Sequence, residues 1–306
     1  MHELFLTASV KQADFDTACA VLQGLSWMTA RRSIYRVLFF AGQAQPRGLA
    51  SPPAVLPRAQ EKQLWTELGK QLQRSSYVLQ AAYEVTPETD FGRAPAAGAD
   101  AAAAAASPSM DFTRLPATLR WLDFPDPFRD SLTAPRKKID PLRDPSATSQ
   151  KGTEPPINSR KKKIDSPITS RKKIEIPFMH GLPKALMDNK QTYTNELIQE
   201  TYSFNRGDLE IVLSRYYHLP ESPGRPIPHL PPWDDLRPVD SAQKWVLNVK
   251  LYVADDGQPE KLVKAHEELM RYKTEFDKLF DFKIVDRKAF DTRISPPPII
   301  PGRGPQ

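Results

Sequence analysis

The stretch KWVLNVKLYVAD, from Lys244 to Asp255, is the clearest strand signal in the sequence. Apolar residues occupy every second position, and most of the intervening positions are polar or charged. An extended chain places alternate side chains on opposite faces, so the pattern predicts a strand with one face against a core. The apolar face comprises Trp245, Leu247, Val249, Leu251 and Val253, and the other face carries Lys244, Asn248, Lys250 and Tyr252.

A hairpin is predicted upstream of this strand. Two β-rich runs, Thr192–Phe204 and Leu209–Leu219, flank a short segment that contains Gly207. A short glycine turn between such runs is typical of antiparallel pairing. The residues Leu209, Ile211 and Leu213 are expected to share one face. Further strands are expected at Glu3–Val10, Ser33–Gly42, Ser76–Val85, Ala117–Pro127 and Asp281–Arg287.

Three amphipathic helices accompany the strands. Apolar residues recur every three or four positions in Phe15–Ser26, Ala59–Arg74 and Pro259–Phe280. Asp14 is expected to cap the first helix, and Pro259 suits the first position of the last one. About eight strands run largely in succession, without alternating regularly with the helices. This order predicts an α+β fold with an antiparallel sheet, either open or closed into a barrel.

Proline content indicates that irregular segments interrupt this body. The chain has 31 Pro and only 13 Gly in 306 residues, and proline is excluded from helix interiors and central strands. We expect one discontinuous domain over residues 1–294, long disordered insertions at 86–116 (Ala/Pro-rich) and 132–170 (basic, Pro/Ser-rich), and a loose tail at 295–306.

Positive charge is concentrated in one part of the chain. Residues 135–176 contain twelve Lys and Arg against five Asp and Glu, whereas the rest has 31 against 32. The body is therefore nearly neutral, which weakens a nucleic-acid-binding interpretation. The basic segment alone would bind nucleic acid weakly, with strong salt dependence and no sequence choice.

Three similar basic stretches occur in this region: Arg136–Asp140, Arg160–Asp165 and Arg171–Glu175. In the third, Ile174 and Ile176 alternate with charged residues, which predicts that this copy enters the fold as a half-buried strand. The first two are expected to lie in the insertion. A nuclear-import signal is one interpretation, formed by Arg160, Lys161, Lys162, Lys163, Arg171, Lys172 and Lys173. A solvated linker is the alternative.

No catalytic or cofactor motif is recognisable. The single Cys19 cannot build a zinc site, and the five histidines lie far apart in the sequence. Asp208 and Glu210 are two positions apart on one strand, an arrangement that can hold a divalent metal. Turn chemistry next to a strand commonly produces such a pair, and this interpretation is favoured because no second carboxylate pair in the sequence matches it. We therefore expect no enzyme, no metal and no cofactor.

The last helix carries Met270, Tyr272, Phe276 and Phe280 at helical spacing. These side chains could form a groove for a partner, but at this spacing they are more often part of the core. The chain also lacks a run of eighteen apolar residues and a signal peptide, so no membrane segment is expected.

Several blocks together resemble the Mediator subunit 18 family. They are MHELFLTASV with ACAVLQGLSWM and RRSIYRVLFF, then ELIQETYSFNRGDLEIVLSRYYHLP (Glu196–Pro220), and the final strand and helix through KIVDRKAFDTRI (Lys283–Ile294). The resemblance covers about 1–85, 119–127 and 171–294. SRKKIEIPFMHGLP (Ser170–Pro183) also resembles a family segment. The extra residues before it are expected to be either a low-complexity insertion or a gene-model artefact.

The resemblance implies an antiparallel β-barrel with flanking helices and a non-enzymatic role in the nucleus. It implies a subunit of the Mediator head module that bridges transcription regulators to RNA polymerase II. The implied partners are Mediator subunit 20, through barrel pairing, and a C-terminal helix of subunit 8. The family barrel is similar to tunnel-type triphosphate phosphohydrolases, whose entry strand carries Glu-x-Glu-x-Lys. Here that strand has Glu3 alone and no Lys, so hydrolysis is the less favoured alternative.

Overall fold

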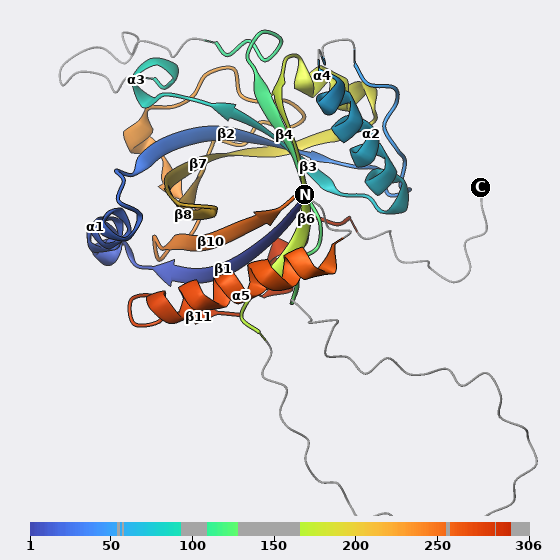
Figure 1. Cartoon of the computed structure of the whole chain (residues 1–306). Coiled ribbons are helices and arrows are strands. Elements are labelled where there is room, and N and C mark those ends of the chain that lie inside the picture. Colours follow the sequence, from blue (N-terminus) through green and yellow to red (C-terminus); the bar gives the residue numbers. More distant parts are fainter. Residues whose placement is uncertain are drawn as a thin grey trace, which may run out of the picture.

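A computed structural model describes residues 1–53, 56, 58–92, 109–127, 166–254, 258–284 and 286–294. Its centre is a barrel of eight antiparallel strands (Figure 1). The strand order is β1, β10, β8, β7, β2, β3, β4, β6, and β6 returns to β1 and closes the circle. The bounds are β1 His2–Val10, β2 Arg31–Ala41, β3 Val78–Glu84, β4 Ala117–Leu122, β6 Thr169–Met179, β7 Thr192–Arg206, β8 Leu209–His218 and β10 Trp245–Val253.

Short strands and helices surround the barrel. Three two-residue strands extend it: β5 (Asp126–Pro127) on β6, β9 (Arg237–Pro238) on β8, and β11 (Phe282–Lys283) on β1. The α-helices of the described part are α1 Phe15–Ser26, α2 Ala59–Arg74, α3 Pro87–Asp90, α4 Leu182–Asp188 and α5 Pro259–Phe276, and its 3-10 helices are η1 Gln12–Asp14, η3 Trp233–Asp235 and η4 Arg287–Phe290. The predicted α+β barrel is confirmed.

Two large apolar clusters lie between the barrel wall and these helices. One joins the outward residues of β1, β8 and β10 to α1 and α5, with Leu22, Leu269 and Phe276 among its fully buried members. The other joins β2, β3, β4 and β6 to α2 and α4. Figure 1 shows α5 along β1 and β10, and α2 with α4 on the other side. Because apolar side chains point outward under the helices, the intervening residues point into the barrel.

The hairpin and the strand of the opening stretch form as predicted. The buried residues of β10 alternate without exception from Trp245 to Val253. Gly207, at φ +61°, occupies the left-handed position of a turn tighter than predicted, because Arg206 already pairs with Leu209. Two helix predictions were wrong in detail. Helix α5 ends at Phe276, four residues early, and Asp14 makes no side-chain capping bond.

The predicted limits of both insertions need correction. In 86–116, α3 is ordered, and Phe91 is buried and bridges to Leu230. At the end of 132–170, Ile168 is fully buried and Thr169 already belongs to β6. The composition of the two segments predicted disorder throughout. The few apolar side chains at their ends are nevertheless buried in the folded body. Residues 93–108, 128–165 and the tail at 295–306 lie outside the described residues.

A buried ion pair holds two irregular segments against the barrel. The fully buried guanidinium of Arg36 donates to Glu196 on the neighbouring strand (2.7 Å) and to the carbonyl of Ile227 (2.6 Å). The amide of Ile227 donates in return to Glu196 (2.7 Å). Arg36 also contacts the Met110 sulfur (3.1 Å) and the Phe112 ring. The proline-rich loop after β8 and the segment before β4 are thereby anchored at one point.

Replacing Arg36 should destabilise the protein strongly. The substitution Arg36→Met leaves the Glu196 carboxylate buried without its cation, a loss of about 3–5 kcal/mol in the free energy of unfolding. Urea unfolding of the wild type and the variant measures this loss of stability. The control is Arg206→Gln, which removes a half-exposed pair with Glu275 and should cost less than about 1 kcal/mol. Equal losses in the two variants would contradict the anchoring role.

Candidate functional site

The inner wall of the barrel carries a network of charged and aromatic side chains. Its members come from five strands: Glu3 on β1, Arg120 on β4, Arg171, Lys173 and Glu175 on β6, Glu210 and Tyr216 on β8, and Lys250 and Tyr252 on β10. They occupy the positions between the outward apolar residues. This interior network is the candidate functional site, because it gathers seven charged side chains and two tyrosines on the inside of the barrel.

Glu3 is the most buried member. Its carboxylate accepts from Arg171 Nε at 2.6 Å, and Lys250 Nζ lies 3.7 Å away. Burial by itself would raise the pKa of Glu3. The positive charges of Lys250, Arg171 and Lys173 outweigh it and lower the pKa to about 2. Glu3 is therefore ionised at every physiological pH and serves as the counter-ion of three cations.

The other two carboxylates of the network are also engaged. Glu210 accepts from the Tyr252 hydroxyl and lies 3.8 Å from Lys250. Burial, followed by the charges of Glu3 and Glu210, raises the pKa of Tyr252, so its hydroxyl stays a donor. Glu175 lies 3.1 Å from Lys173 and 3.3 Å from Arg120. Each carboxylate thus already has a cation.

Asp208 and Glu210, the pair considered as a less favoured metal site, do not lie together in the structure. Asp208 lies exposed in the β7–β8 turn, whereas Glu210 points into the barrel toward Tyr252 and Lys250. Among the described residues, no group of three or more His, Cys, Asp and Glu is placed to hold a metal. Turn geometry beside β8 accounts for the spacing of the two carboxylates in the sequence.

The basic residues predicted for nuclear import are divided by the fold. Arg171, Lys172 and Lys173 are part of β6, where Arg171 pairs with Glu3 and Lys173 with Glu175. The prediction that the third copy enters the fold is confirmed. Lys173 also lies 5.0 Å from the centre of the Tyr252 ring. Arg160 to Lys163 lie outside the described residues.

The aromatic residues of the last helix belong to the core. Tyr272, Phe276 and Phe280 are buried in the cluster beneath α5, and Met270 packs on its edge. The core interpretation is confirmed, and the groove was the wrong alternative. Trp27 was not predicted from the sequence; it is 93% exposed at the end of α1, with φ +56°. No periodic signal marks a single exposed aromatic residue, so only the structure could reveal it.

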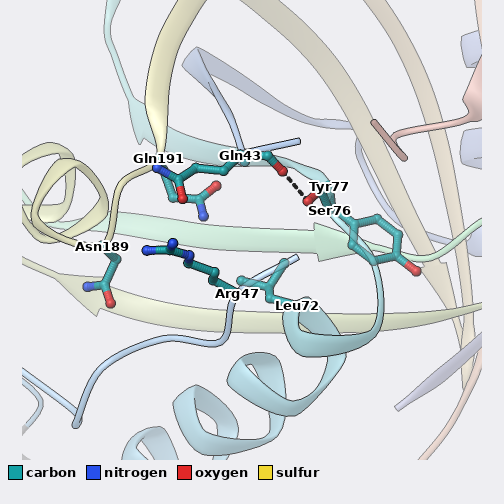
Figure 2. Close-up of a pocket in the computed structure, with 8 residues that line it drawn as sticks. Gln43, Arg47, Leu72, Ser76, Tyr77, Asn189 and Gln191 are labelled. Carbon is teal, nitrogen blue, oxygen red and sulfur yellow. Dashed lines mark hydrogen bonds between the residues drawn. The ribbon is translucent and has the colours of Figure 1, made fainter. Parts of the chain in front are cut away.

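A small hollow lies between α2, α4 and the end of β2 (Figure 2). Figure 2 shows the side chain of Arg47 extending toward Asn189 and Gln191, and the hydrogen bond from Ser76 to the Gln43 carbonyl. The buried Oε1 of Gln191 has no hydrogen-bond partner in the described structure. The space is about 10 Å³, room for about one water molecule. It is too small for a metabolite.

Within the described part of the chain, no helix is both long and apolar enough to cross a membrane.

Comparisons with known proteins point to one family. The family described as "Med18 protein" matches residues 2–149 and 158–293. A Mediator of RNA polymerase II transcription subunit 18 from Aspergillus oryzae is 24% identical over 307 residues, spanning 96% of this chain and 99% of its own length. The corresponding protein of Coccidioides immitis is 25% identical over 299 residues, spanning 96% and 100%.

A solved structure has the same fold. A chain in the structure of the Schizosaccharomyces pombe Mediator head module superimposes with a TM-score of 0.54, covering 93% of this chain and 99% of that one. Its sequence identity of 12% makes this a likeness of fold.

The Glu3 ion pairs should make stability depend on pH in a defined direction. The folded-state pKa is about 2 against an ordinary value of 4.5. The contribution of Glu3, roughly 3 kcal/mol, is therefore complete above pH 4.5 and is lost as the pH falls toward 2. The variant Glu3→Gln should be less stable at pH 7, and its deficit should shrink on acidification. Urea unfolding at pH 7, 5, 4 and 3 tests this, with Glu275→Gln as the control. A deficit that stays constant with pH would refute it.

Proposed function

Because the chain belongs to the Med18 protein family, we propose that it is a non-enzymatic subunit of the Mediator head module that bridges transcription regulators to RNA polymerase II. The observation that carries the proposal is the extent of the family match. It begins at residue 2 and ends at residue 293, and the curated relatives align over 96% of this chain. The likeness therefore includes the whole barrel and its flanking helices.

The interior network supports a role without catalysis. Tunnel-type hydrolysis needs carboxylates that are free to hold a metal ion. Each interior carboxylate lies within 4 Å of a Lys or Arg, which holds for Glu3, Glu175 and Glu210. All three are therefore engaged in internal ion pairs. The function is then expected at the outer surface, through protein contacts.

The proposed partners are Mediator subunit 20, which pairs barrel to barrel, and the C-terminal helix of subunit 8. Trp27 is a candidate contact residue, because exposed tryptophans often carry much of the binding energy of an interface. Its backbone is also left-handed, with φ +56°, a conformation that costs a residue other than glycine about 1–3 kcal/mol.

Co-expression with subunits 20 and 8 tests this proposal. The chain should elute with both in a stoichiometric complex on size-exclusion chromatography. Trp27→Ala should weaken one of the two contacts at least tenfold, and Met187→Ala, an exposed apolar residue on α4, serves as the control. If the folded wild-type chain elutes alone, the proposed partnership fails.

Nuclear location follows from this role, and we propose that Arg160, Lys161, Lys162 and Lys163 are its import signal. Arg171 and Lys173 support β6 instead, because their charges are paired inside the barrel. An import receptor binds basic side chains that are accessible to it. The side chains of Arg171 and Lys173 are not, because they point into the barrel.

Two matched variants separate these roles in cells. Replacing Arg160 to Lys163 by Gln should move a fluorescent fusion from the nucleus to the cytoplasm while the unfolding midpoint stays unchanged. Arg171→Gln should lower that midpoint and leave the folded fraction nuclear. Unchanged location in the first variant would dismiss the import proposal.

A further inference from the structure

The face of helix α2 that points away from the barrel carries a row of positive charge. Lys62, Lys70 and Arg74 are exposed on this face, and Thr66 fills the position between the two lysines. Arg58 continues the row just before the helix begins. Residues four positions apart form a ridge on the surface of a helix. At 1.5 Å per residue this ridge is about 24 Å long, and we call its four cations the α2 ridge.

Two further cations lie at the C-terminal end of the ridge. Arg47 lines the hollow of Figure 2 together with Leu72 of α2 and Asn189. Lys190 follows Asn189 in the chain, and both Arg47 and Lys190 are exposed. The two cations therefore lie next to the turn of α2 that ends in Arg74, and they widen the basic surface beyond the helix.

This side of the molecule has more cations than carboxylates. Residues 43–76 and 182–191 contain seven Lys and Arg against three Asp and Glu. Without these ranges and the basic segment 135–176, the chain has 24 against 29. Four of the seven cations form no ion pair within the described part of the chain: Arg47, Lys62, Arg74 and Lys190. Unpaired positive charge is thus exposed here on a body that is otherwise slightly negative.

Solvent exposure alone does not account for the α2 ridge. Helix α5 is also amphipathic, but it has four cations and four carboxylates, and its Arg271 lies 3.6 Å from Glu268. The only carboxylates of α2 are Glu61, which is buried, and Glu67. Like charges four positions apart on a helix repel each other and destabilise it. An acidic ligand on the ridge would relieve this repulsion.

The long segments outside the described residues do not carry the charge to neutralise the ridge. Residues 93–108 have one Arg and one Asp, and residues 128–165 have ten Lys and Arg against five Asp and Glu. Residues 295–306 have one Arg and no acid. Since none of these segments has an excess of negative charge, the ligand of the ridge is another molecule.

We propose that the α2 ridge is a docking surface for an acidic segment of another protein. Carboxylates at every second residue of an extended segment lie about 6.6 Å apart, close to the rise of about 6 Å between successive ridge positions. One ridge can therefore face several carboxylates of one segment at the same time. The inference goes beyond the proposed function, because this surface belongs to the chain alone and does not require subunit 20 or subunit 8.

Two features favour a protein segment over a nucleic acid. Met187 is an exposed apolar side chain on α4, between Lys184 and Lys190 in the sequence, and it suits an apolar side chain of a peptide. Single-stranded nucleic acids bind to exposed aromatic rings by base stacking. Trp65, the only aromatic residue of α2 and α4, is buried.

Fluorescence anisotropy of the full chain at low ionic strength tests the docking surface. The probe is a labelled peptide in which Glu alternates with Ser and Leu. The wild type should bind it saturably, and the affinity should fall as salt is added, because exposed charges are screened. Lys62→Gln, Lys70→Gln and Arg74→Gln combined should weaken binding at least tenfold. Their unfolding midpoint should not fall, because the substitutions remove like-charge repulsion.

The matched control combines Lys261→Gln, Lys264→Gln and Arg271→Gln on α5. It also removes two lysines and one arginine from the exposed face of a helix, and the affinity should stay within twofold of the wild type. A second control is the same peptide with Gln in place of Glu, which should not bind.

A second measurement locates the contact, because the basic segment 135–176 can also attract the peptide. Carbodiimide treatment joins peptide carboxylates to lysine amines that lie next to them, and mass spectrometry identifies the lysines. Cross-links are expected at Lys62 and Lys70. Cross-links confined to Lys161, Lys162 and Lys163 would overturn the proposal.

Three further results would overturn it. Equal binding by the wild type and the α2 variant would mean that the ridge is only a solvated face. Tighter binding of a DNA duplex, lost in the α2 variant, would assign the ridge to nucleic acid. Self-association that the α2 variant abolishes would assign it to a second copy of this chain. None of these results affects the proposed Mediator assembly, which co-elution with subunits 20 and 8 measures separately.

Discussion

The barrel closes through the ion pair between Glu3 and Arg171. The first strand and β6 share four residue pairs, from His2 opposite Lys172 to Phe5 opposite Thr169. Glu3 and Arg171 stand directly opposite each other in this seam, although 168 positions separate them in the chain. So short a ladder contributes few backbone hydrogen bonds. The buried charges therefore fix its register, because a slip of one residue would turn Glu3 toward the apolar cluster under α5.

The short β1–β6 pairing also leaves the second half of β1 available for another strand. Only the first half of β1 pairs with β6, and Thr7 and Ala8 in its second half pair with β11. Residues 286–294 then pack beside β3 and β5, where the guanidinium groups of Arg287 (4.5 Å) and Arg293 (3.8 Å) both lie over the Phe124 ring. Long segments between the strands are compatible with a closed barrel, because the entropic cost of closing a loop grows slowly with its length. Buried polar anchors such as the Arg36–Glu196 pair then hold the ends of those segments in place.

The sequence predicted what local periodicity encodes. Alternation identified β10, the β7–β8 hairpin and the entry of Ile174 and Ile176 into the fold, and helical spacing identified α1 and α2 with their observed bounds. Closure of the barrel could not be predicted from the residues alone, since the β1–β6 pairing joins strands distant in sequence. The short helix α4 was missed because seven residues carry too little periodicity. The interior network was missed for a different reason. Its members are polar and aromatic residues distributed over five strands, and on each strand they look like a solvent-exposed face.

The interior network also bears on the hydrolytic alternative that the family resemblance raised. Fold alone does not determine activity, so the argument depends on the side chains inside. A metal-dependent tunnel needs an excess of carboxylates, whereas this interior has an excess of cations, and its three carboxylates lie within reach of Lys or Arg. An interior with more carboxylates than cations would require more than a second glutamate on β1. Arg171 and Lys173 would also have to change, and the closure of the barrel depends on Arg171. Barrel closure thus uses a cation at Arg171, whereas a carboxylate-lined metal site would need the opposite charge on β6.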